Sequence, residues 1–477
     1  MPKITDKTAL TAPALEDVIH VVDVSDTTSG AAGTSKKVTL QNIINLGLAY
    51  NDIGVVGQQG FGVGLCPPNN LPIGMSRMPG TETRGHDNYG NYQYQDGSVV
   101  CYVPAHWIKI GTGSNGLLVN VIDVKKYSTY ASKALANAAG YFLPRCFTDG
   151  GLTKPGYFID KYSFSKNAWG SGFIASSIKN GLPLSTASEH NPIADLTACT
   201  VNQYYEAINA AHARDGVNGA VNADSRWFVE SRFIRVNMAQ LSLAHGQTAS
   251  AATYCAWYDG AGVTNFPKGN NNDALRDTND TSVLYATDGY SNCGLTGSGS
   301  PFAKTTHNGQ NCGVCDLNGN MYGINIGVTS EGTKYYVAKE AAEMRKFTAG
   351  NTLSTDHWGS VGIAANMQEV SIPFFTATEW LGVGSGANQV FSEVLTGNGA
   401  LLRSLGLPMD ANGISANGIN QYGLDKIYSS VLCNELCVLS GLYWNYSSRA
   451  GVWGSFWNDA LAYSNNFVGA RAACFPV

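Results

Sequence analysis

The sequence predicts an α+β fold, in which a few helices accompany many short strands. Two long stretches, 200–214 and 225–245, show the apolar spacing of amphipathic helices. The sequence around them is rich in Gly, Asn and Ser, with 55 Gly in 477 residues, and contains only short strand-like runs. No internal repeat of fixed period is visible. Helices embedded in such loop-rich, short-stranded sequence are typical of an α+β domain.

The composition predicts a folded chain of two to four domains. Hydrophobic residues make up 44% and charged residues 14%, the opposite of a disordered chain. The net charge of −5 disfavours nucleic acid as a partner, because nucleic-acid-binding proteins carry a basic patch. No apolar run approaches the roughly 20 residues that cross a bilayer, so we expect no membrane insertion. The first residues lack the pattern of a secretory signal, so we expect assembly in a cytoplasm.

Neither a metal nor a cofactor is predicted. The eleven cysteines are expected to be reduced and buried, since no secretory context favours disulfides. The only CxxC pair, at 312–315, lacks the second pair of ligands that a zinc site needs. His307 lies nearby but does not have the spacing of a zinc ligand. Asp273, Asp277 and Asp280 lack the Gly and terminal Glu of an EF-hand loop, so we interpret them as solvated turn residues rather than calcium ligands.

The first 48 residues predict a small N-terminal module. An alternating apolar run at 18–24 predicts a strand, and a turn, a further run at 36–40 and a short helix at 41–46 follow. A module this small buries too little apolar surface to be stable alone, so we expect it to oligomerise or to dock onto another protein. The pattern TALTAPALEDVIHVVDVSDTTSGAAGTSKKVTLQNII resembles the N-terminal modules of phage tail and tail-fibre proteins. The resemblance implies attachment to a virion through other tail proteins.

Residues 49–148 predict a β-rich segment with strand-like runs at 98–103, 106–110 and 117–124. The turn at 111–116 matches GxGxxG. In dinucleotide-binding folds that pattern leads from a strand into a helix. Here strand-like runs lie on both sides, so we predict a hairpin turn.

The two predicted helices have definite faces and ends. In the first, Tyr204, Ala207, Ile208 and Ala211 share one side, which is expected to face the core. The second is longer and is expected to end at Gly246, a plausible C-cap.

Three stretches in one order carry a resemblance that covers 149–477. They are PGYFIDKYSF at 155–164, GVCDLNGNMY at 313–322, and VLSGLYWN at 438–445 followed by FVGAR at 467–471. They resemble motifs of the C-type-lectin-like fold shared with the formylglycine-generating enzymes. The two helices fall between the first and second stretches, as in that fold. The resemblance implies a C-type-lectin-like domain over 149–477.

Two features of these stretches have a direct physical interpretation. The Asp316-Leu-Asn-Gly-Asn320 run is turn chemistry, with residues that tolerate a left-handed backbone. Arg471 lies in what is expected to be the last core strand. It either buries its stem and ties loop carbonyls together with its forked donors, or it is an ordinary surface arginine. The sequence leaves both alternatives open.

The last stretch, 440–477, resembles the variable proteins of diversity-generating retroelements, the tropism determinants of phages among them. The run GLYWNYSSRAGVWGSFWNDALAYSNNFVGARAAC carries this resemblance. In that family a reverse transcriptase copies a template with errors at adenines, and the copy replaces the 3′ end of the gene. A fixed frame then alternates with varied positions. Tryptophan codons contain no adenine, so the Trp residues fit the frame.

The resemblance divides this stretch into two sets. The frame residues are Trp444, Ala450, Gly451, Val452, Trp453, Trp457, Val468, Gly469 and Arg471. The candidate variable residues, expected to form the ligand-binding surface, are Tyr443, Asn445, Tyr446, Ser448, Arg449, Gly454, Phe456, Asn458, Asp459, Tyr463, Asn465, Asn466 and Phe467.

Three functional hypotheses follow. The leading one is a phage tail-tip receptor-binding protein in the virion, whose variable region binds a host cell-surface protein or glycan. Phage members of the family are trimers, so a homotrimer is expected. The second is a prophage-borne or cellular ligand-binding protein of the same family, which would carry a secretion signal or lipobox in place of the N-terminal module.

The third hypothesis is a formylglycine-generating-like oxidase. Cys433, Cys437 and Cys474 have no basic neighbour that would activate a thiol. No GxSxG, HExxH or P-loop motif occurs. Binding is therefore favoured over catalysis, and we expect that the protein is not an enzyme.

Overall fold

The computed structural model describes residues 18–23, 34–39, 49–197, 203–260, 265–346, 366–383, 390–409, 414–415, 424–431 and 435–477. The chain divides into two compact units, Met1–Tyr50 and Asn51–Val477. In the first unit, strand β1 (Val18–Asp23) pairs antiparallel with β2 (Thr34–Thr39). These strands coincide with the two runs of the N-terminal pattern, and the helix expected at 41–46 lies outside the described residues.

A six-stranded sheet spans the second unit from its beginning to its end. Its order is β13-β24-β10-β5-β4-β3, with every neighbouring pair antiparallel. Strand β24, at the end of the chain, lies between β10 and β13. The strands are β3 (Met75–Arg77), β4 (Asn91–Tyr94), β5 (Val99–Pro104), β10 (Gly156–Asp160), β13 (Trp227–Val229) and β24 (Ala472–Cys474).

A seven-stranded sheet has the order β19-β18-β20-β22-β21-β14-β23. The pairs β20–β22 and β14–β23 are parallel and the other pairs are antiparallel. The strands are β14 (Tyr322–Asn325), β18 (Trp380–Val383), β19 (Ile414–Ser415), β20 (Lys426–Tyr428), β21 (Leu436–Ser440), β22 (Ser455–Ala460) and β23 (Val468–Gly469).

Smaller sheets complete the β-structure. One has three strands, β15 (Val328–Glu331), β16 (Lys334–Ala338) and β17 (Met367–Val370). The others are pairs: β6 (His106–Ile110) with β7 (Ile122–Lys126), β8 (Thr148–Asp149) with β9 (Leu152–Thr153), and β11 (Ser165–Trp169) with β12 (Gly172–Ser176).

The GxGxxG turn joins two strands of one hairpin, as predicted. Strands β6 and β7 pair antiparallel, from His106 opposite Lys126 to Ile110 opposite Ile122. The predicted third strand at 117–124 begins late, at Ile122, because Asn120 has a φ of 62° and ends a turn. No helix follows this Gly-rich turn, so it does not have the geometry of a dinucleotide-binding loop.

The described residues contain the helices α2 (Lys133–Ala138), α3 (Gln203–His212), α4 (Arg232–Thr248) and α6 (Gly397–Ser404). The expected face of α3 is confirmed, since Tyr204, Ala207, Ile208 and Ala211 are all fully buried. The fold is α+β. None of the described helices combines the length and apolar character needed to cross a membrane.

Helix α4 differs from its prediction at both ends. The expected helix start at 225–231 contains strand β13, which pairs with β24, and the side chain of Ser231 caps the helix by accepting the Ile234 N–H. Gly246 is inside the helix rather than its C-cap. A Cβ at Gly246 would lie 3.0 Å from the Asn265 carbonyl oxygen and 3.1 Å from Trp257, so glycine serves close packing there.

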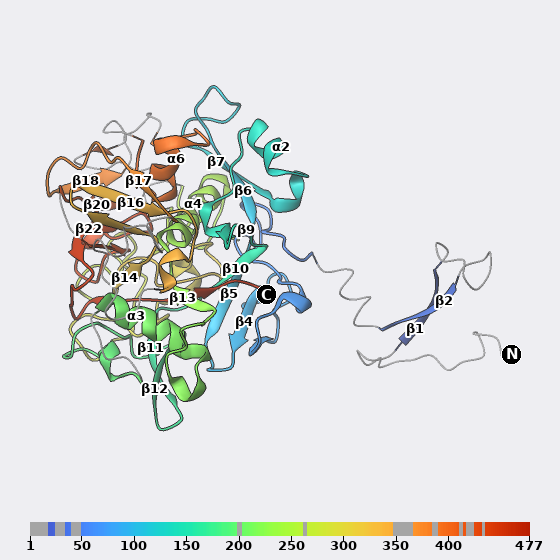
Figure 1. Ribbon diagram of the computed structural model, residues 1–477, viewed down its shortest axis with the longest axis horizontal. Coiled ribbons are helices and arrows are strands. Elements are labelled where there is room, and N and C mark those ends of the chain that lie inside the picture. The colour runs from blue at the N-terminus through green and yellow to red at the C-terminus, as the bar shows by residue number, and fades with distance from the viewer. Residues whose placement is uncertain are drawn as a thin grey trace. The chain divides into compact units, whose positions relative to one another are not determined.

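The interior of the second unit is organised around α4. Figure 1 shows this helix in the middle of the unit, with β18, β20 and β22 on its left and β5 and β10 on its right. Its residues from Arg232 to Gly246 are all buried. Arg232 donates to the Leu405 carbonyl at 2.8 Å and to Ser440 Oγ at 2.7 Å. A buried helix with such donors ties the surrounding segments together.

The segments 49–148 and 149–477 are not separate units. Strand β5 pairs with β10 from Gly156 opposite Pro104 to Asp160 opposite Val100. The β-rich segment therefore shares a sheet with the region that follows it.

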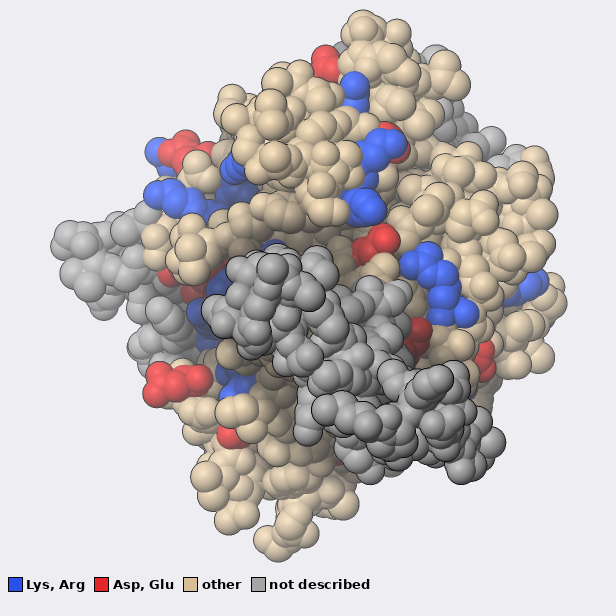
Figure 2. Space-filling model, turned by 90° about the vertical axis from the view of Figure 1, so that its right-hand side faces the viewer, with Lys and Arg blue, Asp and Glu red and all other residues tan. Residues whose placement is uncertain are grey.

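Figure 2 shows the face of the molecule on the right of Figure 1, where Lys and Arg are interspersed with Asp and Glu among the coloured residues.

Candidate functional site

The terminal segment, 436–477, contributes to both large sheets. Strands β21 and β22 pair antiparallel, with Leu436 opposite Ala460 and Ser440 opposite Ser455. β22 also runs parallel to β20, and β23 runs parallel to β14. The chain then ends in β24 of the six-stranded sheet. The loops between these strands are therefore held at both ends by paired backbone.

All nine frame residues of this segment are buried. The ring of Trp453 stacks on Phe391 with centroids 4.8 Å apart. Trp457 packs edge-on against Phe375, with ring centroids 5.5 Å apart. Burial of large rings contributes most of the energy of such cores, so these residues fix the path of the segment.

Packing also requires the two frame glycines. A Cβ at Gly451 would lie 1.7 Å from Oδ1 of Asp425, and a Cβ at Gly469 would lie 2.9 Å from the Leu184 carbonyl oxygen. Asp425 is buried and accepts a hydrogen bond from the Trp453 N–H at 2.8 Å. Burial raises the pKa of Asp425 to about 8. A side chain at Gly451 would disturb this buried carboxyl.

Of the two alternatives for Arg471, the structure shows the first: the side chain is buried and binds loop carbonyls. Its guanidinium donates to the carbonyl oxygens of Asp160 at 3.1 Å and Cys315 at 2.9 Å. It also donates to the Asp316 carbonyl and lies 3.8 Å from the Glu230 carboxylate. Arg471, which belongs to the third stretch, therefore binds backbone carbonyls of the first and second stretches.

The turn at the second stretch has the predicted backbone. Asp316 has a φ of 53°, Gly319 of 64° and Asn320 of 58°. A Cβ at Gly319 would lie 2.3 Å from the carbonyl oxygen of Asn270. The turn leads directly into β14, which runs beside β21 and β23.

Twelve of the thirteen candidate variable residues are at least partly exposed. Asn445 and Arg449 are the most exposed. The partly exposed ones are Tyr443, Tyr446, Ser448, Phe456, Asn458, Asp459, Tyr463, Asn465, Asn466 and Phe467.

Gly454 is the exception, and its assignment as an outward-pointing position is wrong. It is buried, and its N–H donates to the Gly451 carbonyl at 3.0 Å while its own carbonyl accepts from the Gly441 N–H at 2.9 Å. A Cβ there would lie 3.1 Å from the Gly451 carbonyl oxygen. Gly454 is a turn residue enclosed by backbone.

Four of the five aromatic candidates form one continuous cluster around the buried Tyr322, and no ring contact joins the fifth, Tyr463, to it within the described residues. Tyr443 stacks on Phe467 with ring centroids 3.9 Å apart, and Tyr446 meets Tyr443 edge-on at 4.7 Å. Tyr322 lies between 5.5 and 5.9 Å from the rings of Tyr443, Tyr446, Phe456 and Phe467. Partly exposed rings of this kind offer large, rigid contact area.

Two rings from other strands extend the cluster, and sequence reasoning missed both. Tyr428 of β20 stacks on Phe456 with centroids 4.4 Å apart. Trp380 of β18 lies 5.2 Å from the Tyr446 ring, and the Arg449 guanidinium lies over it at 5.2 Å. We call Trp380, Tyr428, Tyr443, Tyr446, Phe456 and Phe467, with the buried Tyr322 beneath them, the aromatic surface. The sequence offered one signal for them: each of the two short strand-like runs contains an aromatic residue, at 380 and at 428.

Backbone hydrogen bonds anchor the loops that carry the candidates. The Ser447 N–H donates to the Asn271 carbonyl at 2.6 Å, and the Asp273 N–H donates to the Trp444 carbonyl at 2.7 Å. These bonds do not involve the outward side chains. Exchange of those side chains therefore leaves the anchors of the loop intact.

A buried polar cluster supports the surface from beneath. His190 Nε2 lies 2.6 Å from Asp288 Oδ2, and His190 Nδ1 bonds the Asn466 carbonyl. The imidazole also stacks on Tyr290 with centroids 4.1 Å apart. With Cys293, three ligand types lie within 4.8 Å of one another. The hydrogen bonds account for His190 and Asp288 without an ion, and they hold the backbone at Asn466.

Burial raises the pKa values of several ionisable groups of the site, Tyr446 and Tyr463 among them. Burial raises the pKa of Asp459 to about 6, which puts its charge change close to neutral pH. Burial also raises the pKa of Tyr443 to about 12, so this phenol stays protonated and can donate a hydrogen bond to a ligand.

The aspartates and cysteines outside the segment have structural surroundings. Asp277 is buried and accepts the N–H groups of Gly269 and Asn279, which corrects its interpretation as a solvated residue. All nine cysteines in the described part of the chain are free and buried. Burial raises the pKa of Cys474, so its reactive thiolate form is scarce at neutral pH.

No family model and no curated protein matches this chain.

Proposed function

We propose that this chain is a phage tail-tip receptor-binding protein with a C-type-lectin-like domain. Its candidate variable residues, apart from Gly454, are diversified by a retroelement and bind ligands on the host surface. The aromatic surface is the centre of that binding site. The unit that contains β1 and β2 attaches the protein to the virion.

One observation carries this proposal: the division of the terminal segment that the family resemblance and codon logic predict coincides with its division by burial. All nine frame residues are buried, whereas twelve of thirteen candidates reach the surface. A diversified segment needs this arrangement, because random exchange of buried rings would unfold the protein. Exposed positions on an anchored backbone tolerate exchange at little cost in stability.

Chemistry of the site supports binding. Tyr and Trp present rigid contact area with few rotatable bonds, and Asn, Ser and Asp add adaptable hydrogen bonds. A single site of this kind binds weakly, and a homotrimer with several copies per particle raises the avidity.

The neighbouring DNA tests the diversification. The proposal expects a reverse-transcriptase gene and a near-copy of the coding segment for 440–477 that differs only opposite adenines. A genome without such a repeat contradicts diversification, although the binding surface survives that result.

Binding is tested with purified full-length protein and host cells. Tyr446→Ala removes a ring from the middle of the aromatic surface and is expected to weaken binding about tenfold or more. The matched control is Phe173→Ala, which removes an aromatic ring that is 41% exposed on β12. Equal binding by both variants would contradict the proposal.

A further inference from the structure

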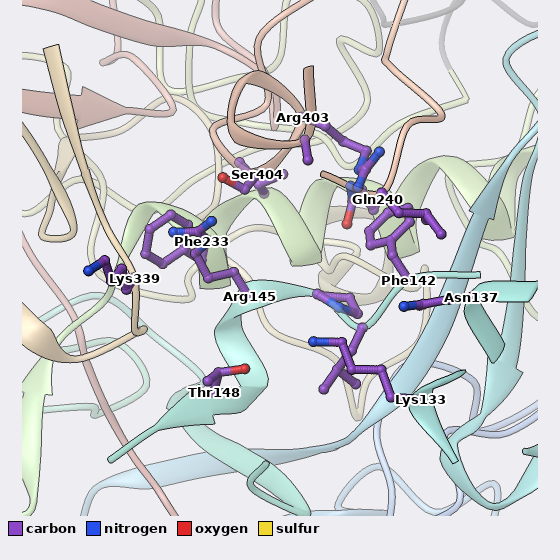
Figure 3. Close-up of a pocket in the computed structure, with 15 residues that line it drawn as sticks. Lys133, Asn137, Phe142, Arg145, Thr148, Phe233, Gln240, Lys339, Arg403 and Ser404 are labelled. Carbon is purple, nitrogen blue, oxygen red and sulfur yellow. The ribbon is translucent and has the colours of Figure 1, made fainter. Parts of the chain in front are cut away.

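A cavity lies away from the terminal segment, among α2, α4, α6 and the turn that precedes β8. Its volume is about 240 Å³, slightly below the 300–1,000 Å³ of pockets for drug-sized ligands. Figure 3 shows side chains from these elements around one space, with Lys133 and Asn137 on one side and Arg145 and Phe233 on the other. None of its lining residues belongs to the aromatic surface.

The charged residues that line the cavity are all basic. Lys133, Arg145, Lys339 and Arg403 line it, and no Asp or Glu does among the described residues. The whole chain, in contrast, carries a net charge of −5. Four basic side chains around one small space, without a compensating carboxylate, favour a negatively charged occupant.

The two arginines are held by neutral groups. Arg403 is 4% exposed, donates to the carbonyl oxygens of Ser392 and Val394 at 2.6 Å, and lies 3.8 Å from the centroid of Phe142. Arg145 donates to the Ala338 carbonyl and lies over Phe233. Neither guanidinium has a carboxylate partner within the described residues.

Burial of both cations has an electrostatic cost. Burial lowers the pKa of Arg145 to about 10, and burial together with the nearby Arg145 charge lowers the pKa of Arg403 to about 9. An anion between these groups would offset both effects. The forked guanidinium geometry suits carboxylate or phosphate oxygens.

A glutamine of α4 adds a neutral hydrogen-bonding group to the cavity. Gln240 of α4 is 3% exposed, lines the cavity, and has no hydrogen-bond partner among the described residues. Figure 3 shows this amide beside Arg403 at the cavity. Gln240 is not among the enclosed polar atoms that lack a partner, so its amide is open to the cavity and free to hydrogen-bond a polar ligand there.

We propose that this cavity binds a small organic anion of about monosaccharide size. Arg145, Arg403 and Lys133 bind its carboxylate or phosphate oxygens, the Gln240 amide bonds a hydroxyl or carbonyl, and Phe233 and Val236 contact its apolar face. The site is independent of the receptor-binding surface.

Calorimetric titration of the full-length protein tests this site with four probes: glucuronate, glucose 6-phosphate, glucose and inorganic phosphate, at constant ionic strength. At least one of the two sugar anions is expected to bind with 1:1 stoichiometry, and the tighter one identifies the preferred oxyanion. Glucose is expected to bind at least about tenfold more weakly. Failure of both sugar anions to bind up to about 10 mM would overturn the proposal. Inorganic phosphate that binds as tightly as the sugar anions would equally exclude a ring-sized organic ligand.

Variants connect binding to the cavity. Lys133→Gln removes an exposed charge at the cavity and is expected to weaken binding several-fold, and raised salt is expected to weaken it further. Gln240→Leu removes the amide without changing charge and is also expected to weaken binding. The matched control, Lys126→Gln, removes an exposed lysine of β7 that does not line the cavity. Equal affinity of the Lys133 and Lys126 variants would overturn the assignment.

Discussion

Arg471 and Arg449 lie in the same terminal segment, yet the structure predicts opposite consequences for their removal. Arg471 is 1% exposed and joins backbone carbonyls of the first and second stretches. Arg449 is exposed and contacts the Trp380 ring at 5.2 Å. Replacing each by Ala therefore compares a frame residue with a candidate variable residue of the same chemistry.

The magnitude for Arg471→Ala follows from the partners that it leaves behind. Three buried carbonyl oxygens lose a charged donor, and the Glu230 carboxylate loses a cation 3.8 Å away, although Arg235 still pairs with Glu230 at 3.0 Å. Breaking a buried charged network of this size costs about 3–5 kcal/mol. Arg449→Ala removes one exposed cation–π contact, which contributes up to about 1 kcal/mol.

The assay is denaturant unfolding of the full chain, followed by tryptophan fluorescence. Arg471→Lys keeps the charge but loses the fork, so it should recover about half of the lost stability. It also provides a measurable variant if Arg471→Ala does not fold. A loss below about 1 kcal/mol for Arg471→Ala, equal to that of Arg449→Ala, would refute the role of Arg471 as the joint of the three stretches.

Three further predictions concern the site. Gly451→Ala should destabilise the protein by about 2–3 kcal/mol, because its Cβ would collide with Asp425. Gly454→Ala should cost less than about 1.5 kcal/mol. A larger loss for Gly454→Ala than for Gly451→Ala in unfolding measurements would contradict this packing. The pKa of Asp425 is about 8 in the folded state and about 3.9 in the unfolded state. Its titration should therefore lower the free energy of unfolding as the pH rises between those two values. Asp425→Asn should remove this contribution, at most about 1.4 kcal/mol per pH unit, and an unchanged pH profile of unfolding would contradict it. Tyr446→Ala should lower stability by only about 1 kcal/mol, because its ring is partly exposed, and a loss above about 3 kcal/mol would make it a core residue.

Local periodicity was sufficient to predict some elements and insufficient for others. The buried face of α3 follows from apolar spacing alone, and all four expected residues are buried. The start of α4 was misplaced because Trp227–Val229 pair with β24, whose residues lie more than 200 positions later. No local pattern reveals a strand partner at that separation.

At the candidate site, too, local sequence patterns did not reveal what long-range packing decides. The family resemblance indicated the frame residues, and codon logic supports only its Trp members, because Trp codons contain no adenine; Trp453 and Trp457 are both buried. Gly454 was misassigned because its surroundings are set by the Gly451 backbone, which only the fold reveals. Trp380 and Tyr428 were missed because β18 and β20 reach the surface through long-range pairing.

The most direct test of the diversified surface is sequencing of codons 440–477 in many particles grown from one clone. The account predicts substitutions at the codons of the exposed candidates, Tyr446 and Phe456 among them, and none at the codons of Trp444, Trp453 and Trp457. Substitutions that are absent, or as frequent in the buried frame as at the surface, would contradict it.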